Sequence, residues 1–302
     1  MGDDGAPEPA RSAAGPVAPD RRSVLGGLVA VAATLGPVRG LADGTPLRFG
    51  LTPVFLTNDL RLLTDLEAYL ERATGRPVQL VMRRTYQEIT ALLVSGQLDA
   101  AWICGFPFVQ FRERLSLVAV PIWRGEPLYR SYLIVRSGRP ASILEDLAGD
   151  LHAFSDPDSN SGYLVTRALL AERGSAPDTF FRKTIFTYGH RNVVRAVASG
   201  LAQSGSVDGY VLEVLREVEP DLADHVSVFR ASEWLAFPPV AAPAAARDSG
   251  TTRAIRSALL GMADDEAGRT ILATLRLDGF EEHAATLFDP IARKVALVGR
   301  LD

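Results

Sequence analysis

The chain has 302 residues, of which 47% are hydrophobic and 23% are charged, a composition typical of a globular protein with one large or two smaller domains. Its 32 Lys and Arg residues against 36 Asp and Glu residues give a formal net charge of −4. We find no basic stripe, so the charge pattern argues against a nucleic-acid partner. The single cysteine, Cys104, excludes an internal disulfide.

Residues 1–42 are predicted to be an export signal with a disordered leader, outside the folded domain. Paired arginines at 21–22 precede an apolar stretch at 24–35, which is too short to span about 30 Å of hydrocarbon. The pair resembles a twin-arginine signal, although the neighbouring residues depart from that pattern. Residues 40–42 suit a signal peptidase, so the mature chain is expected to begin near Asp43, in the periplasm.

From residue 47 onward, strand-like and helix-like segments alternate. Strands are expected at 47–52, 78–82, 100–104, 117–121, 129–136, 151–154, 184–187, 207–208 and 226–229. Helices are expected at 59–74, 86–95, from about 107, and at 162–173, 193–199, 211–218, 252–262, 265–275 and 290–298. This alternation predicts an α/β fold with mostly parallel sheets, covered by helices on both faces.

The segment 236–246, "AFPPVAAPAAA", is expected to return the chain to its first α/β unit after a second unit. We therefore predict one lobe from 43–133 plus 236–302 and another from 134–235, joined by a two-segment hinge with a ligand cleft between them. In open α/β sheets, ligands bind beyond the carboxyl ends of strands, where helices begin. The strand-to-helix loops are therefore the first places to look for a site.

The loop "DPDSNSGYL" concentrates small polar residues where a helix begins, at Ser159, Asn160, Ser161 and Gly162. The first four N–H groups of a helix lack partners and carry partial positive charge, so an oxyanion can bind there without a basic side chain. The serine and asparagine side chains add donors, and the glycine permits close approach. The alternative is a plain N-cap, in which Ser161 or Asn160 only completes the helix.

Five segments carry a resemblance to a known family: "DAAWICGFPFV", "YRSYLIV", "DPDSNSGYLVTRALL", "HRNVVRAVASGLAQSGSVDGYVLE" and "FPPV". They occur in the order seen in the periplasmic phosphate/phosphite/phosphonate-binding proteins of the PhnD type, and the similarity extends from about 47 to 293. The resemblance implies a type II periplasmic binding protein that closes on a small anion and delivers it to an ABC permease or a membrane sensor. Such proteins do no covalent chemistry, and a monomer is expected.

The resemblance also implies residues that contact the ligand. His190 is the counterpart of a ligand-facing histidine, with Asn192 beside it, and Asp208 matches an acidic residue that contacts the amino group of aminophosphonates in some relatives. Each has an ordinary alternative, because His190 suits an exposed turn and Asp208 suits a helix cap. Tyr129 and Ser131 lie on the strand that enters the hinge and are expected to reach the cleft.

The first-lobe side of the predicted cleft is expected to include the loops 52–55 and 104–108. Its candidate contacts are Thr52, Phe55, Cys104, Gly105 and Phe108. Relatives often have tyrosine hydroxyls where this chain has Phe55 and Phe108, so this wall is expected to be less polar.

Cys104 follows a strand and begins a helix, where a lowered thiol pKa would favour a soft ligand. A subgroup of the family, the arsenite-binding sensors, is similar and uses a cysteine in this region, with signalling to a membrane histidine kinase. The alternative is an inert cysteine packed beside Trp102. A third interpretation is a binding protein that has lost transport and serves a neighbouring periplasmic enzyme system.

Enzyme chemistry is not supported by any motif. The four histidines lack HExxH spacing, and the sequence contains neither a GxSxG nucleophile elbow nor a P-loop. We therefore expect no catalytic residue, no cofactor and no metal site other than an arsenite contact at Cys104. A solute-binding protein for a small oxyanion is the main prediction.

Overall fold

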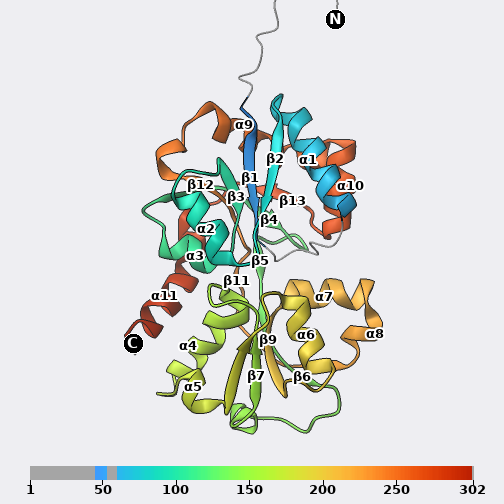
Figure 1. The fold of residues 1–302 in the computed structure, drawn as a ribbon, viewed down its shortest axis with the longest axis vertical. Coiled ribbons are helices and arrows are strands. Elements are labelled where there is room, and N and C mark those ends of the chain that lie inside the picture. The colour runs from blue at the N-terminus through green and yellow to red at the C-terminus, as the bar shows by residue number, and fades with distance from the viewer. Residues whose placement is uncertain (1–44, 53–59, 301–302) are drawn as a thin grey trace, which may run out of the picture. The chain divides into compact units, whose positions relative to one another are not determined.

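The computed structural model describes residues 45–52 and 60–300, which lie within one compact unit of the chain. A six-stranded sheet has the spatial order β13-β4-β12-β3-β1-β2 (Figure 1). Its strands are β1 (Leu47–Leu51), β2 (Val78–Met82), β3 (Ala100–Trp102), β4 (Leu115–Ile122), β12 (Val240–Pro243) and β13 (Gly279–Glu281). We call this sheet and its helices the first lobe.

The directions of these strands add detail to the prediction. β1 pairs in parallel with β2 and β3, whereas β12 runs antiparallel between β3 and β4, and β13 runs antiparallel beside β4. β1 to β4 all point the same way, as the prediction of a mostly parallel sheet requires, and β12 and β13 run against them. The returning chain inserts β12 between β3 and β4, and this insertion makes the sheet mixed.

Helices cover both faces of this sheet, with α1 and α10 on one side and α2 and α3 on the other (Figure 1). The helices are α1 (Leu60–Thr74), α2 (Tyr86–Val94), α3 (Gly105–Gln110), α9 (Gly250–Leu260), α10 (Glu266–Leu275) and α11 (Asp289–Val298), with short 3₁₀ turns η3 (Ala244–Ala246), η4 (Met262–Asp264) and η5 (Ala285–Phe288). α1 shows why they form: Leu62, Leu66, Tyr69 and Leu70 recur every three or four residues and are buried against the sheet side.

A five-stranded sheet, in the order β10-β6-β9-β7-β8, forms the core of what we call the second lobe. Its strands are β6 (Ser131–Arg136), β7 (Leu151–Phe154), β8 (Lys183–Phe186), β9 (Ser204–Asp208) and β10 (Val226–Ala231). Its helices are η1 (Leu144–Leu147), η2 (Asn160–Leu164), α4 (Val165–Ala171), α5 (Pro177–Phe180), α6 (His190–Ala198), α7 (Gly209–Val218) and α8 (Pro220–Ala223). β7, β8 and β9 are parallel, and β6 runs antiparallel beside β9, so this sheet is also mixed.

Two short strands join the sheets along the chain: β5 (Leu128–Tyr129) pairs antiparallel with β11 (Leu235–Ala236). The single strand expected at 129–136 is thus split at Arg130. There the carbonyl of Arg130 accepts a hydrogen bond from Gly209 N at 2.9 Å, and a Cβ on residue 209 would lie 2.7 Å from that oxygen. The expected boundary between residues 133 and 134 falls inside β6, and the lobe ranges remain a prediction.

A polar network is buried inside the second lobe. His152 Nδ1 lies 2.8 Å from Ser204 Oγ, its Nε2 lies 2.8 Å from Ser206 Oγ, and Ser206 Oγ lies 2.7 Å from Thr166 Oγ1. The imidazole also stacks on Phe181, with ring centroids 4.2 Å apart. Burial lowers the pKa of His152 to about 3, so this histidine is neutral and fully bonded.

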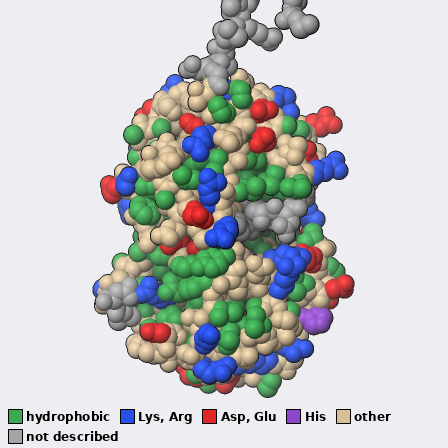
Figure 2. Space-filling model, viewed as in Figure 1, with side chains coloured by type: hydrophobic (Ala, Val, Ile, Leu, Met, Phe, Trp, Pro, Cys, Tyr) green, Lys and Arg blue, Asp and Glu red, His purple; other side chains and the backbone are tan. Residues whose placement is uncertain are grey.

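The length of the helices and the charges on the surface bear on possible membrane and polyanion contacts. Over the described ranges, no helix combines the length and the apolar character that crossing a membrane requires. On the face shown in Figure 2, basic and acidic side chains are interspersed, without a large patch of one sign.

Candidate functional site

The helix that opens the second-lobe polar loop begins with a capped π turn. Ser159 Oγ accepts a hydrogen bond from the backbone N–H of Gly162 at 2.9 Å, so Ser159 is the N-cap. A Cβ on residue 162 would lie 1.9 Å from Ser155 Oγ, and only glycine fits there. Ser159 thus performs the capping that the ordinary interpretation gave to Ser161 or Asn160, which leaves those two side chains for other contacts.

Asn160 lies at the first position of η2 and is fully buried. Its backbone N–H donates to Cys104 Sγ at 3.1 Å, and its side-chain Nδ2 donates to the Tyr129 hydroxyl at 2.9 Å. Its Oδ1 is buried and has no hydrogen-bond partner among the described residues. Three elements thus meet at one asparagine, and one acceptor is left open.

Ser161 connects η2 to β6 and to the start of α7. Its carbonyl accepts from Ser131 Oγ at 2.6 Å, and its own Oγ donates to Asp208 Oδ2 at 3.4 Å. Ser161 is itself buried, and its backbone N–H lies in the first turn of η2, where N–H groups lack intrahelical partners. Asp208 caps α7 by accepting from Val211 N at 3.2 Å, and burial raises the pKa of its carboxyl to about 7.

His190 begins α6 and is 2% exposed, which excludes the exposed-turn interpretation. Its Nδ1 accepts from the backbone N–H of Asp208 at 3.1 Å, so the proton of the neutral ring is on Nε2. That Nε2 lies 3.3 Å from the Tyr86 hydroxyl. Burial lowers the pKa of His190 to about 3, so the ring is a neutral donor.

Tyr86 and Asp156 belong to this arrangement, although neither was predicted from the sequence to be a site residue. The backbone N–H of Tyr86, at the start of α2, donates to Asp156 Oδ2 at 3.2 Å, and Asp156 Oδ1 accepts from Asp158 N at 2.8 Å. The carboxylate of a second-lobe residue therefore lies at the N-terminus of a first-lobe helix, a favourable position for negative charge. The available signals were the position of Asp156 in the quoted loop and a tyrosine directly after a strand-to-helix turn.

Cys104 lies at the N-cap position of α3 and is only 3% exposed. Burial raises the pKa of its thiol to about 12, although hydrogen bonds from the backbone of Asn160 and Phe106 act in the opposite direction. The expectation of a lowered thiol pKa is therefore wrong, because desolvation outweighs the short helix behind it. The thiol nevertheless contacts η2, because it accepts the hydrogen bond from Asn160 N–H.

Three other first-lobe candidates pack against other parts of the first lobe. Phe108 packs on Phe288 with ring centroids 4.7 Å apart, and a Cβ on Gly105 would lie 2.7 Å from Ile291 Cδ1, so both face the C-terminal segment that includes α11. Thr52 Oγ1 donates to the carbonyl of Trp102 at 3.2 Å. Phe55 lies outside the described residues.

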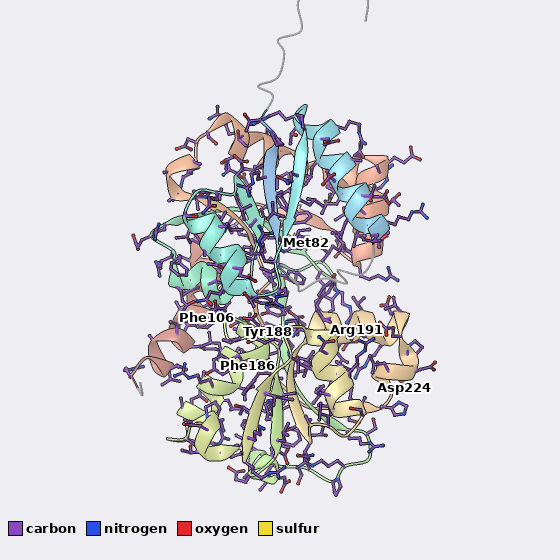
Figure 3. The ribbon with its side chains drawn as sticks, viewed as in Figure 1. Met82, Phe106, Phe186, Tyr188, Arg191 and Asp224 are labelled. Carbon is purple, nitrogen blue, oxygen red and sulfur yellow. The ribbon has the colours of Figure 1, made fainter. Side chains whose placement is uncertain are left out.

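Asn192 is also not brought to the others. Its side chain is exposed, and its Nδ2 donates to the carbonyl of Thr187 at 3.0 Å, across the turn that contains Tyr188 (Figure 3). Tyr188 is 49% exposed and has a positive φ of 51°, which is uncommon for an aromatic residue. Asn192 thus holds the turn before α6.

The backbone N–H of Ser155 donates to the carbonyl of Gly162 at 3.2 Å, which adds Ser155 to the residues above. We call the set joined by these contacts the interlobe cluster: Tyr86, Cys104, Tyr129, Ser131, Ser155, Asp156, Ser159, Asn160, Ser161, His190 and Asp208. It contains no lysine or arginine, and the nearby Arg191 (Figure 3) pairs with Glu219. No group of three potential metal ligands occurs among the residues that the structure describes. Its chemistry is that of neutral donors and buried acceptors, suited to binding a small polar solute.

Known proteins place the chain in a family. The family model for phosphonate periplasmic substrate-binding proteins of ABC transporters matches residues 49–287. The phosphate-import protein PhnD of Mycolicibacterium smegmatis is 29% identical over 184 residues, which cover 56% of this chain and 57% of that protein. The chain therefore spans little more than half the length of this relative.

Two solved structures share the fold. A binding protein component of an ABC phosphonate transporter from Pseudomonas aeruginosa has a TM-score of 0.78 at 20% identity, over 86% of this chain and 88% of that one. PhnD1 from Prochlorococcus marinus, in complex with methylphosphonate, has a TM-score of 0.77 at 18% identity, over 85% of this chain and all (100%) of that one. The fold is that of a two-lobe type II periplasmic binding protein, and the chain belongs to the phosphonate periplasmic substrate-binding protein family of ABC transporters.

Proposed function

We propose that the interlobe cluster captures one small tetrahedral oxyanion of the phosphate, phosphite or phosphonate kind. The observation that supports this most is the set of unpartnered polar groups within one short segment. Ser155 Oγ and Asn160 Oδ1 are buried, and neither has a partner among the described residues. The backbone N–H of Ser161 lies in the first turn of η2, where helix N–H groups lack intrahelical partners. Buried polar groups in native proteins are nearly always bonded, so these groups are suited to hydrogen-bond a small polar ligand.

The cluster suits an anion for electrostatic reasons. The start of η2 supplies backbone N–H groups, His190 supplies a neutral Nε2–H, and the Tyr86 and Tyr129 hydroxyls supply further donors. Because the interlobe cluster contains no lysine or arginine, the binding free energy must come from neutral dipoles that are buried and aligned. Asp208, protonated below a pKa of about 7, adds a donor at low pH and an acceptor at high pH.

Binding and closure are coupled in this proposal. Tyr86 and Cys104 come from the first lobe, and they contact Asp156, His190 and Asn160 of the second. A ligand that contacts both sides stabilises the closed arrangement relative to an open one. We propose that the loaded protein then delivers the oxyanion to an ABC permease, without covalent chemistry.

The remaining parts of the proposal concern the whole chain. Residues 1–42 direct export by the twin-arginine route, and the mature protein, from near Asp43, acts as a periplasmic monomer. Its lobes comprise 43–133 plus 236–302 and 134–235. The family match and the name of the Mycolicibacterium relative support transport of phosphate or phosphonates.

Calorimetric titration of residues 43–302 with phosphate, phosphite, methylphosphonate and aminoethylphosphonate tests the proposal. We expect at least one of them to bind with a single site, and Ser161→Ala to weaken that binding, since its hydroxyl orients Asp208. Full retention of binding in Ser161→Ala would remove the segment 159–162 from the site. Absence of binding by all four would contradict the oxyanion assignment.

A second candidate is an arsenite-binding sensor that signals to a membrane histidine kinase. The contact of Cys104 Sγ with the N-terminus of η2 favours it, because the thiol faces the cluster. The raised thiol pKa opposes it, because a soft metalloid prefers the thiolate. Arsenite in the same titrations decides: binding of arsenite alone, lost in Cys104→Ser, would replace the main proposal by this one.

A further inference from the structure

The side-chain amide of Asn160 is held in one orientation by the residues around it. Its Nδ2 donates to the Tyr129 hydroxyl at 2.9 Å, and its backbone N–H is fixed by Cys104 Sγ at 3.1 Å. Tyr129 is itself 1% exposed and packs on Phe237 with ring centroids 5.6 Å apart, so the hydroxyl has little freedom to move. The remaining amide atom, Oδ1, is buried and unpartnered.

A buried carbonyl oxygen without a protein partner requires a donor. The donors of the cluster, at Ser161 N–H and His190 Nε2, suit the oxygens of an oxyanion, whereas Oδ1 repels them. A ligand that places an O–H there satisfies Oδ1, and a ligand that places a methyl group there leaves it unsatisfied.

We propose that Asn160 Oδ1 is a specificity-determining acceptor, which makes the site prefer an oxyanion with an additional hydroxyl, phosphate, over an alkylphosphonate of the same charge. This inference rests on the proposed oxyanion site and names its substrate class. Sites built to bind a ligand hydroxyl reject analogues that lack it more strongly than apolar pockets reject a missing methylene.

The test compares phosphate with methylphosphonate by calorimetry on residues 43–302. The pH is set well below the pKa of about 7 of Asp208, where that residue is a donor and both ligands are monoanions. Phosphate then carries two hydroxyls and methylphosphonate carries one, so the two ligands differ by one O–H against CH₃. We expect wild type to prefer phosphate by about 10- to 100-fold.

Variants of Asn160 locate the preference. Asn160→Leu, of similar volume, is expected to remove most of the phosphate preference by weakening phosphate while leaving methylphosphonate binding within about 3-fold. Tyr129→Phe frees the amide to rotate and is expected to reduce the preference by a smaller factor. Asn192→Ala, a change to an exposed asparagine that bonds Thr187, is the control and should keep the wild-type ratio.

Three outcomes separate the claims. An equal loss of both ligands in Asn160→Leu would overturn the inference, since the amide would then act as a general donor. A wild-type preference for methylphosphonate would overturn it as well, while leaving the oxyanion site intact. Binding of neither ligand by wild type would instead contradict the proposed function itself.

Discussion

The second lobe contains two buried polar regions built from the same residue types, and they differ in one respect. In the core network, both ring nitrogens of His152 are bonded to the hydroxyls of Ser204 and Ser206. In the interlobe cluster, His190 bonds its own lobe through Nδ1 and points Nε2 at the first-lobe Tyr86. Burial lowers the pKa of both histidines to about 3, so exposure and pKa do not distinguish them.

What distinguishes the two regions is whether their hydrogen bonds are complete within one lobe. The core network is complete within one lobe and stabilises it, as satisfied buried networks do. The interlobe cluster contains unpartnered atoms at Ser155 and Asn160, and some of its hydrogen bonds are made only with residues of the first lobe. Completeness therefore separates structural from functional polar groups here better than residue type does.

The largest expected effect concerns Asp208. Its pKa is raised from 3.8 to about 7, so the folded state holds the proton more tightly and stability falls as pH rises from about 4 to about 7. Asp208→Asn removes this cost and keeps an oxygen that can cap α7. We expect the variant to be more stable than wild type by up to about 4 kcal/mol at pH 8, with a difference near zero at pH 4.

Urea denaturation at the two pH values measures this. The low-pH comparison is the internal control, because at pH 4 the carboxyl is protonated in the folded state and about half protonated in the unfolded state, so ionisation adds little to the difference. A stability difference that does not change with pH would show that Asp208 has an ordinary pKa, and hence that its carboxyl is accessible to solvent.

His152 should affect stability alone. His152→Leu leaves the Ser204 and Ser206 hydroxyls without their shared partner, and we expect a loss of about 3 kcal/mol in the free energy of unfolding. The dissociation constant of the oxyanion should stay within about 2-fold, because neither serine belongs to the cluster. A large loss of affinity at unchanged stability would reverse the roles of the two regions.

His190 should show the opposite pattern. His190→Leu removes the Nε2–H donor, and we expect affinity to fall by about 10- to 100-fold. The stability of the ligand-free protein should fall less than in His152→Leu, since only the bond from Asp208 N is lost within the lobe. Calorimetry and urea denaturation of both leucine variants give the comparison, and equal effects in both assays would contradict it.

The contact of Asp156 with the start of α2 should control closure more than binding chemistry. Asp156→Ala removes the acceptor of Tyr86 N–H, and we expect affinity to fall by about 5- to 10-fold. Small-angle scattering should show a more expanded ligand-free ensemble than wild type, and ligand should restore the compact form. An unchanged scattering profile with unchanged affinity would remove Asp156 from the closing contacts.

Cys104→Ser is expected to have the smallest effect. The serine oxygen can accept from Asn160 N–H as the thiol does, so the phosphate or phosphonate affinity should stay within about 3-fold. Titration of wild type and variant in parallel measures this. A complete loss of oxyanion binding would mean that the thiol contacts the ligand directly.

Sequence periodicity predicted the alternation of strands and helices and the two lobes, because buried faces impose it locally. It could not predict the insertion of β12 between β3 and β4, which depends on where the chain returns after a long detour. Within the site, Ser159 to Gly162 were named from their position at a helix start, and His190 and Asp208 were named from the family resemblance. Tyr86 and Asp156 were missed because their contact joins residues 70 positions apart, across two lobes.

Some residues predicted for the site do not lie in the interlobe cluster, because their side chains point in directions that the sequence does not reveal. Asn192 and Phe108 lie on the expected loops, yet the helical turn points one outward and the helix α3 points the other toward Phe288. Side-chain direction on a short helix depends on its exact start, which sequence patterns do not determine.

A crystal structure of residues 43–302 grown with phosphate or methylphosphonate tests the central claim most directly. We expect the phosphorus atom beside the start of η2, with ligand oxygens within hydrogen-bond distance of Ser161 N–H and His190 Nε2. A ligand bound outside the interlobe cluster, with Asn160 Oδ1 still unpartnered, would contradict the account.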